Sequence, residues 1–237
     1  VTNLFQASNL MLEYVDLSHI SYYYKMINLN NIEHFAQGGN RRCFVHPLKK
    51  DRCLKVSFEG QSEKVKKNAA WYKKLRSAES FDDNLREQSA YQQRSLKNNN
   101  PNKWKHLAKW YGMVETSIGP ASETELILDK DQNIAMTLEK YLFTFGMTGE
   151  IKQAIDDFES WLRSSLVLTK NIIPHNIVVG YEDNLIVLKI IDGLGSSSFV
   201  PLPEISDFFA KRYIERRIQL MWSRINWDLS GRKGSWK

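Results

Sequence analysis

The chain has 237 residues, of which 33 are Lys or Arg and 27 are Asp or Glu, so its formal net charge is +6. Its hydrophobic fraction of 42% and charged fraction of 25% are typical of globular domains and exclude a mainly disordered chain. No segment reaches the ~18 consecutive apolar residues that a membrane-spanning helix needs, and no signal-peptide pattern opens the chain. The sequence therefore predicts a cytoplasmic protein without a membrane span.

Two cysteines, Cys43 and Cys53, and five scattered histidines exclude a disulfide framework and a zinc site, because structural zinc needs four such ligands at close spacing. Residues 1–30 follow no sustained period. We expect them to be an N-terminal extension outside the native domain, with translation of that domain starting at Met26. The tail, residues 229–237, is basic and rich in glycine, which predicts disorder.

From Ile32 the chain has the pattern of short strands separated by polar turns. An antiparallel meander is expected for the first three of five predicted strands, which are 32–36, 43–46, 53–57, 110–115 and 124–128. The turn between the last two is placed at 118–120. Two helices are predicted between the third and fourth strands, at 64–74 and 82–96, the second capped by Ser80 or Asp82.

Beyond residue 130 the apolar residues follow the spacing of amphipathic helices. Helices are predicted at 150–163, capped by Thr148, and at 203–222. Between them lie a strand and loop at 166–179 and an apolar strand at 185–191. A strand-rich half carrying one main helix, followed by a helix-rich half, predicts an α+β protein with two lobes.

Two features in the first half have the residue types of a phosphate site. Gly38 and Gly39 lie between two strands, where their backbone N–H groups can approach an anion and Arg41 and Arg42 add positive charge. An ordinary hairpin turn is the alternative. Lys55 lies in an apolar strand, where it either contacts an anion such as phosphate or faces solvent.

Two features in the second half could hold a metal ion. Asn176 and Asp192 end neighbouring strand segments and offer the hard oxygen ligands that Mg²⁺ prefers, although Asn and Asp at strand ends are commonly turn formers. A glycine hairpin, a strand lysine, a glutamate-bearing helix, an Asn and an Asp-Gly follow one another in this order. That order is the layout of protein kinases.

At these residues the sequence resembles the bacterial YrbL proteins, a family of the protein-kinase-like superfamily linked by name to the PhoP regulatory network. The resemblance covers residues 32–225 and is carried by the segments 39–47, 52–56, 111–116, 174–178, 191–195 and 200–202. It implies a bilobal protein-kinase-like fold. A small antiparallel-sheet N-lobe with one main helix is expected at 31–129, and a mainly helical C-lobe at 130–228.

The resemblance also implies ATP and Mg²⁺ as cofactors. Lys55 matches the lysine that holds the α- and β-phosphates, with Glu87 or Glu79 as its ion-pair partner. Asn176 and Asp192 match the metal ligands. Further nucleotide contacts are expected from the glycine turn and from the hinge at 126–129, whose backbone binds adenine: Gly38, Gly39, Arg41, Leu128 and Asp129.

Asn171 stands where kinases carry the catalytic aspartate, and no later glycine completes the phosphate loop. An amide cannot accept the proton of a substrate hydroxyl, and a general base contributes about 10²–10⁴ in rate. Two functions therefore stay open. One is a phosphotransferase whose acceptor is a protein, a sugar or another small molecule. The other is an inactive pseudokinase acting as a nucleotide-sensing regulator or scaffold. Nucleic-acid binding, through the basic helix segment 211–217, is the least favoured.

Overall fold

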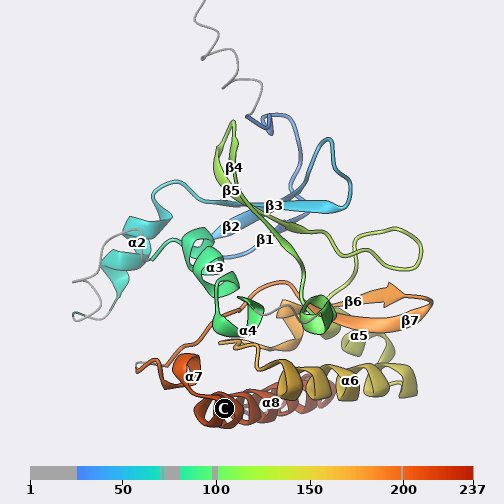
Figure 1. The fold of residues 1–237 in the computed structure, drawn as a ribbon. Helices are drawn as coiled ribbons and strands as arrows, with labels where there is room; N and C mark the ends of the chain where they lie inside the picture. The colour runs from blue at the N-terminus through green and yellow to red at the C-terminus, as the bar shows by residue number, and fades with distance from the viewer. Residues whose placement is uncertain (1–25, 70, 72–80, 98–100, 199, 237) are drawn as a thin grey trace, which may run out of the picture.

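The structure is a computed structural model that describes residues 26–69, 71, 81–97, 101–198 and 200–236. A sheet-based lobe lies above a helical lobe in Figure 1. The first lobe contains β1 (Ala36–Gln37), β2 (Arg41–Val45), β3 (Arg52–Ser57), α2 (Gln61–Asn68), α3 (Asp83–Tyr91), β4 (Trp110–Thr116) and β5 (Gly119–Glu125). The short helices α4 (Arg94–Lys97) and η2 (Pro101–Trp104) connect α3 to β4.

The second lobe contains four α-helices and one strand pair among the described residues. They are α5 (Leu138–Phe145), α6 (Gly149–Ser165), η3 (Pro174–Asn176), β6 (Ile177–Glu182), β7 (Leu185–Ile190), α7 (Leu202–Ile205) and α8 (Asp207–Leu229). Figure 1 shows β6 and β7 between the sheet and the layer of α6 and α8. The predicted α+β class, a small antiparallel-sheet lobe with one main helix followed by a mainly helical lobe, is confirmed.

The five strands of the first lobe form one antiparallel sheet in the order β1-β2-β3-β5-β4. The meander predicted for the first three strands is confirmed by β1, β2 and β3, although β1 covers Ala36–Gln37 instead of 32–36. After β3 the chain leaves the sheet for α2 and α3 and returns at the far edge. β5 begins at Gly119, where φ is +115°, and ends at Glu125. The strand predicted at 124–128 is therefore displaced, because β5 begins directly after the two-residue turn at 117–118 and ends where the predicted strand begins.

Two predicted helices are interrupted. α3 starts on Asp82, whose carboxylate accepts hydrogen bonds from the backbone N–H groups of Asn84 and Leu85, as expected of a cap. It ends at Tyr91, and helical structure resumes in α4 after Gln93, whose side-chain oxygen accepts from the backbone N–H of Leu168 in the second lobe. The helix predicted at 203–222 breaks into α7 and α8 at an extended residue, and α8 continues to Leu229.

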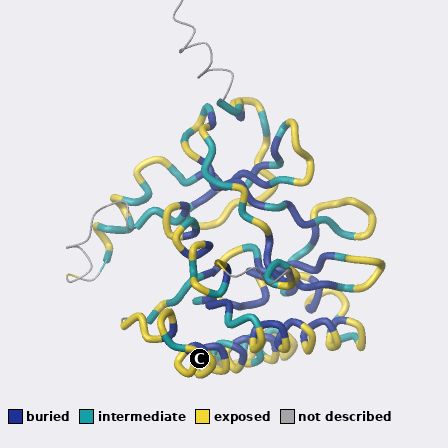
Figure 2. The backbone as a smooth tube through the Cα atoms, viewed as in Figure 1, coloured by how far each residue is buried: buried dark blue, intermediate teal, exposed yellow. Residues whose placement is uncertain are grey.

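Both lobes have their own apolar core (Figure 2). The core of the second lobe is the larger and gathers residues of α5, α6, α8, β6 and β7. The core of the sheet contains Leu29, Phe44, Leu54, Val56 and Ala121. Leu29 is buried and Ile27 bonds to the backbone of β4, so the first lobe begins before the expected boundary at residue 31.

Some predictions fall on residues that the structure does not describe. The extension over 1–25, the alternative cap Ser80 and the alternative partner Glu79 lie outside the described residues, as do residues 70 and 72–74 of the helix predicted at 64–74. The described helix there, α2, begins earlier than predicted, at Gln61, and ends at Asn68. The tail differs from the expected disorder, because Arg232 pairs with Glu139 and Asp228. None of the described helices is long and apolar enough to cross a bilayer.

Candidate functional site

Lys55 points out of β3 toward the second lobe rather than into solvent. Its neighbours Leu54 and Val56 point to the opposite face of the sheet, into the core of the first lobe. The Nζ atom of Lys55 lies 2.5 Å from Glu87 Oε1 and donates a hydrogen bond of 2.6 Å to the backbone oxygen of Ile191. Burial opposes its charge, but Glu87 outweighs burial, so the pKa of Lys55 is raised and it stays an ammonium.

Glu87 is the α3 glutamate that meets Lys55. Of the two candidates left open by the sequence, Glu79 lies outside the described residues and Glu87 accepts from Lys55 directly. Its second oxygen, Oε2, lies 2.7 Å from Arg41 Nη1. One buried carboxylate therefore holds two buried cations, one from β2 and one from β3.

Arg41 connects the two lobes at this point. Its Nη2 atom lies 3.0 Å from Asp192 Oδ2, while Nη1 contacts Glu87. Burial opposes the guanidinium charge, yet Glu87 and Asp192 together raise its pKa above the ordinary value. Burial likewise opposes the charge of Asp192, but Arg41 and Lys55 prevail and lower its pKa. The four side chains form an ionised cluster with two positive and two negative charges.

Asn84 is a residue of this cluster that the sequence analysis missed. It is buried in the first turn of α3, where its Oδ1 accepts from Arg41 Nη1 at 3.2 Å. Its Nδ2 donates to the backbone oxygen of Lys55 at 3.0 Å. The signal was its position one α-helical turn before Glu87, which puts both side chains on one face of the helix.

The loop around Asn171 is closed onto the Asp192-Gly193 turn. The backbone N–H of Asn171 donates to the oxygen of Gly193 at 3.3 Å, and Asn176 Nδ2 donates to the oxygen of Asn171 at 2.8 Å. The backbone N–H of Gly193 donates to Asp192 Oδ1 at 2.6 Å. These contacts bring together the three predicted residues Asn171, Asn176 and Asp192, which are separated in the chain.

Two hard-oxygen donors are available for a cation here. The amide of Asn176 donates through nitrogen, which leaves its oxygen as an acceptor, and half of the Asp192 side chain is exposed. Within the described part of the chain no three His, Cys, Asp or Glu residues form a metal-binding group. One carboxylate and one amide fit Mg²⁺ bound together with phosphate and water, and do not form an all-protein cage.

Other predicted contacts lie at the margin of this cluster. Gly38 donates to the backbone oxygen of Arg41 at 2.9 Å, as in a hairpin turn, and no atom lies within 4 Å of a Cβ built on Gly39. Arg42 points to the opposite face from Arg41, with its guanidinium carbon 5.1 Å from the centre of the Phe58 ring. The structure does not bring Arg42 to the cluster, because neighbouring residues of a strand face opposite ways.

The predicted hinge forms a tight turn. Leu128 pairs with Ile134, and the Asp129 carboxylate accepts from the backbone N–H groups of Asp131 and Asn133, both at 2.9 Å. The side chain of Asp129 is therefore occupied by its own turn. Beside it, a small buried cluster of Ala108, Ile127, Ala135 and Val178 lies between the lobes.

Both cysteines lie on the face of the sheet that carries Lys55. Cys43 is directly opposite Lys55 in the register of β2 and β3, and Cys53 precedes Lys55 by two residues. A hydrogen bond from Cys53, helped by the charges of Lys55 and Arg41, lowers the pKa of Cys43 to about 7. The sequence analysis used these cysteines only to exclude other sites, because register is not visible without pairing.

Comparison with known proteins gives a family and a set of structural similarities. Residues 27–226 match the sequence model of a family described as PhoP regulatory network protein YrbL. The YrbL proteins of Escherichia coli (strain K12) and Shigella flexneri are each 22% identical over 207 residues, which is 84% of this chain and 86% of theirs.

Among solved structures, the kinase domain of Mycobacterium tuberculosis PknI is similar to 81% of this chain. A double mutant of that domain has a TM-score of 0.48 at 13% identity, with 70% of its own length covered. The domain itself has a TM-score of 0.46 at 12% identity, with 72% covered.

Proposed function

The chain belongs to the YrbL family of PhoP regulatory network proteins, and on that premise we propose that it is a kinase-like protein that binds ATP with Mg²⁺ and transfers phosphate to an acceptor. The observation that carries the proposal is the charged cluster of Lys55, Glu87, Arg41 and Asp192, which come from β3, α3, β2 and the turn after β7. Its two cations, Lys55 and Arg41, meet on one carboxylate, Glu87, and this convergence supports a site where two cations contact a phosphate group.

Each residue of the cluster has a role in this proposal. Lys55 and Arg41 neutralise phosphate oxygens, and Glu87 fixes the position of both cations. Asn176 and Asp192 would hold Mg²⁺, which when bound supplies charge stabilisation to the phosphates. Because Asp192 is paired with Arg41, the protein keeps this carboxylate ionised and oriented before any ligand is present.

Asn171 favours a second candidate function, an inactive pseudokinase that senses nucleotide. Its backbone is fixed by Gly193 and Asn176, but its amide side chain cannot take a proton from an acceptor hydroxyl. A site of this kind can bind nucleotide and change the stability of the protein without turnover.

The nucleotide proposal is tested by the melting temperature. Ligand at 100 times its Kd stabilises a protein by about 2.7 kcal/mol, which for a chain of this length is a rise of roughly 5–10 °C. We expect ATP with Mg²⁺ to produce this rise in the wild-type protein and a much smaller one in Asp192→Asn. The matched control is Asp131→Asn, an exposed carboxylate in the hinge turn. An equal rise in Asp192→Asn and the control contradicts the proposal.

Turnover separates the two candidates. With a panel of protein, sugar and small-molecule acceptors, Asn171→Asp should raise ATP consumption by about 10²–10⁴ if the protein is a phosphotransferase lacking its base. Nucleotide binding with no turnover in either form would instead support the pseudokinase.

A further inference from the structure

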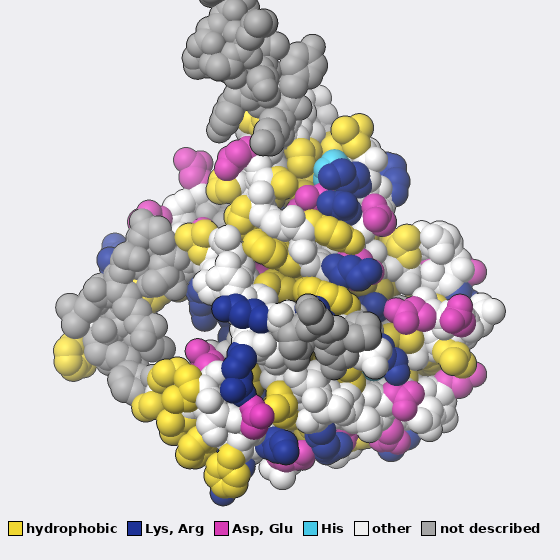
Figure 3. All heavy atoms as spheres, in the orientation of Figure 1, with side chains coloured by type: hydrophobic (Ala, Val, Ile, Leu, Met, Phe, Trp, Pro, Cys, Tyr) yellow, Lys and Arg dark blue, Asp and Glu magenta, His cyan; other side chains and the backbone are white. Residues whose placement is uncertain are grey.

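Large apolar side chains gather on the surface around α7 and the start of α8. Figure 3 shows hydrophobic side chains over these two elements, at the lower left of the molecule. Ile205 is 67% exposed, Phe208 is 61% exposed and Val200 is 53% exposed. Leu202 and Phe209, which are 38% and 41% exposed, complete a set that we call the apolar patch. Folded proteins rarely leave a group of large apolar side chains in water unless another surface covers it.

The five side chains of the apolar patch form one surface. Val200, Leu202 and Phe209 line a single pocket of about 650 Å³. The ring of Phe208 lies edge-on to the ring of Phe209, with 5.4 Å between the ring centroids. Ile205 follows Leu202 by three residues in α7, which puts both side chains on one face of that turn. Ile205 and Phe208, the most exposed of the five, lie outside the lining of the pocket.

Positive charge borders the apolar patch on α8. Lys211, Arg212 and Arg216 are exposed and line the same pocket as the patch. None of the three forms an ion pair within the described part of the chain, and the guanidinium carbon of Arg212 lies 5.8 Å from the centre of the Phe208 ring. Because α8 buries its other face in the core of the second lobe, these side chains are left to solvent.

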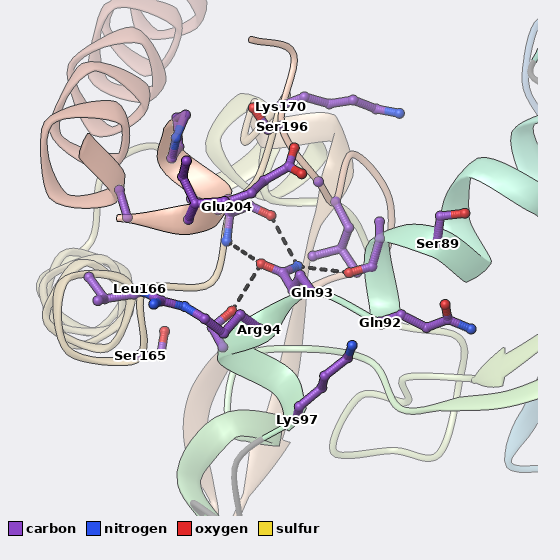
Figure 4. A pocket seen from close by; sticks show the side chains of 18 of the residues that line it. Ser89, Gln92, Gln93, Arg94, Lys97, Ser165, Leu166, Lys170, Ser196 and Glu204 are labelled. Carbon is purple, nitrogen blue, oxygen red and sulfur yellow. Dashed lines mark hydrogen bonds between the residues drawn. The ribbon is translucent and has the colours of Figure 1, made fainter. Parts of the chain in front are cut away.

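The nearby carboxylates do not offset this positive charge. Glu215 pairs with Arg163 of α6, with 2.8 Å between Oε1 and Nε. Asp207 pairs with Arg94 of α4. Glu204 lines a different cavity, between α7 and the helices α3 and α4, which Figure 4 shows. The apolar patch is therefore bordered by three cations whose charge the surrounding acidic residues leave uncompensated.

Apolar side chains beside uncompensated cations fit an anionic lipid surface. Apolar side chains can insert below the headgroups there, while Lys and Arg keep their charges at the level of the lipid phosphates. A segment of a partner protein seated in the pocket would leave Ile205 and Phe208 outside it. A symmetric pair of copies of this chain would bring the same cations face to face. A nucleic acid would match the charge and not the apolar side chains.

We propose that the apolar patch and the three cations beside it bind the surface of an anionic lipid bilayer. Ile205 and Phe208 insert among the lipids. Lys211, Arg212 and Arg216 contact the phosphates of the headgroups. A small apolar patch and a few cations each bind a membrane weakly, so both contributions are needed. This surface includes no residue of the charged cluster at the candidate site, so it stands independently of the proposed nucleotide site.

The test is co-sedimentation of the full chain with vesicles of phosphatidylcholine that contain phosphatidylglycerol, compared with vesicles of phosphatidylcholine alone. We expect binding to the anionic vesicles, weakened by added salt, and little binding to the neutral ones. Phe208→Ser should weaken binding about tenfold or more, because an apolar side chain no longer leaves water. Lys211→Ala and Arg216→Ala should each weaken it about fivefold.

Two matched variants control for nonspecific binding. Phe143→Ser removes a phenylalanine of α5 that is 90% exposed, and Lys130→Ala removes an exposed lysine of the hinge turn. Both should bind the anionic vesicles like the wild type. Absence of binding to anionic vesicles overturns the proposal, and so does equal weakening in Phe143→Ser and Phe208→Ser. Phe208→Ser should melt like the wild type, because the side chain that it removes is exposed.

Sedimentation velocity without vesicles tests a second copy as the occupant. We expect no self-association that depends on Phe208. A dimer that Phe208→Ser disperses would make the apolar patch an interface between copies and would overturn the lipid proposal. None of these measurements uses nucleotide, so a failure of the protein to bind ATP leaves their outcome unchanged.

Discussion

At the scale of single residues, Arg41 decides the character of the site. Lys55 and Glu87 alone form a neutral buried pair, and Arg41 adds a second cation that reaches Asp192 across the lobes. A buried arginine is stable only with its partners in place, because unpaired burial of a charge is costly. The same contacts that form the proposed phosphate site therefore also stabilise the fold.

Replacing Arg41 should reveal that dependence. Arg41→Met leaves Lys55 on Glu87 but removes the contacts to Asn84 and Asp192, and we expect a loss of about 3 kcal/mol in the free energy of unfolding. Urea denaturation measures it. Arg86→Met is the matched control, because that arginine forms an exposed pair worth about 0–1 kcal/mol. Equal losses in both variants would show that the buried network is not stabilising.

At the scale of elements, the site depends on a loop and a turn held face to face. The turn after β7 needs Gly193, whose φ is +84° and whose Cα lies so close to the loop that an added Cβ would be 2.6 Å from the oxygen of Asn171. This approach sets the positions of Asp192 and Asn176. An element of the fold, and not one residue, therefore brings the two oxygen donors together.

Gly193→Ala should disturb this junction. A left-handed backbone and a collision with a backbone oxygen predict a loss of at least about 2 kcal/mol in the free energy of unfolding, and a weaker melting-temperature rise with ATP and Mg²⁺. Gly39→Ala, where no atom lies within 4 Å and φ is not in the left-handed region, should change stability by no more than about 1 kcal/mol. Similar stability of both variants would refute the close approach.

At the scale of the whole molecule, the connection between the lobes runs through His106. Its backbone oxygen accepts from Ile190 of β7, and its ring packs against Phe158 and Trp161 of α6. Nδ1 lies 2.8 Å from the oxygen of Leu188, which can only accept, so this nitrogen carries the hydrogen. Nε2 is buried without a partner among the described residues. The ring is therefore held neutral inside the second lobe.

This burial predicts a pH dependence of stability. Burial lowers the pKa of His106 from 6.5 to about 4. Between these values the unfolded chain binds a proton that the folded chain does not, so stability is complete above pH 6.5 and falls toward pH 4. The change of 2.5 pKa units corresponds to about 3 kcal/mol. The difference in unfolding free energy between the wild type and His106→Gln should shrink by this amount from pH 7 to pH 4. Parallel pH curves would contradict the prediction.

Much of the fold of this protein could be predicted from the sequence, because it depends on local residue patterns. The alternation around Lys55, the cap at Asp82 and the helical spacing after Thr148 are local effects of side-chain period and hydrogen bonding, and they predicted the sheet, α3 and α6. The order of the glycine hairpin, Lys55, Asn176 and Asp192 indicated the site. The errors lie at the ends of elements, and the place of β5 between β3 and β4 was not predicted, because both depend on contacts between residues distant in the chain.

The sequence by itself determined the two-lobed α+β class and indicated most of the residues of the candidate site, because hydrophobic period and motif order are local properties of the chain. Only the tertiary structure decided that Arg41 bridges Glu87 and Asp192. It also placed Asn84 beside Arg41 and Cys43 opposite Lys55, and it directed Arg42 away from this cluster. The physical reason is that strand register and lobe packing select which face a side chain presents and which charge it meets. Val200 and Phe209 likewise come to line one pocket only when α7 packs against α8.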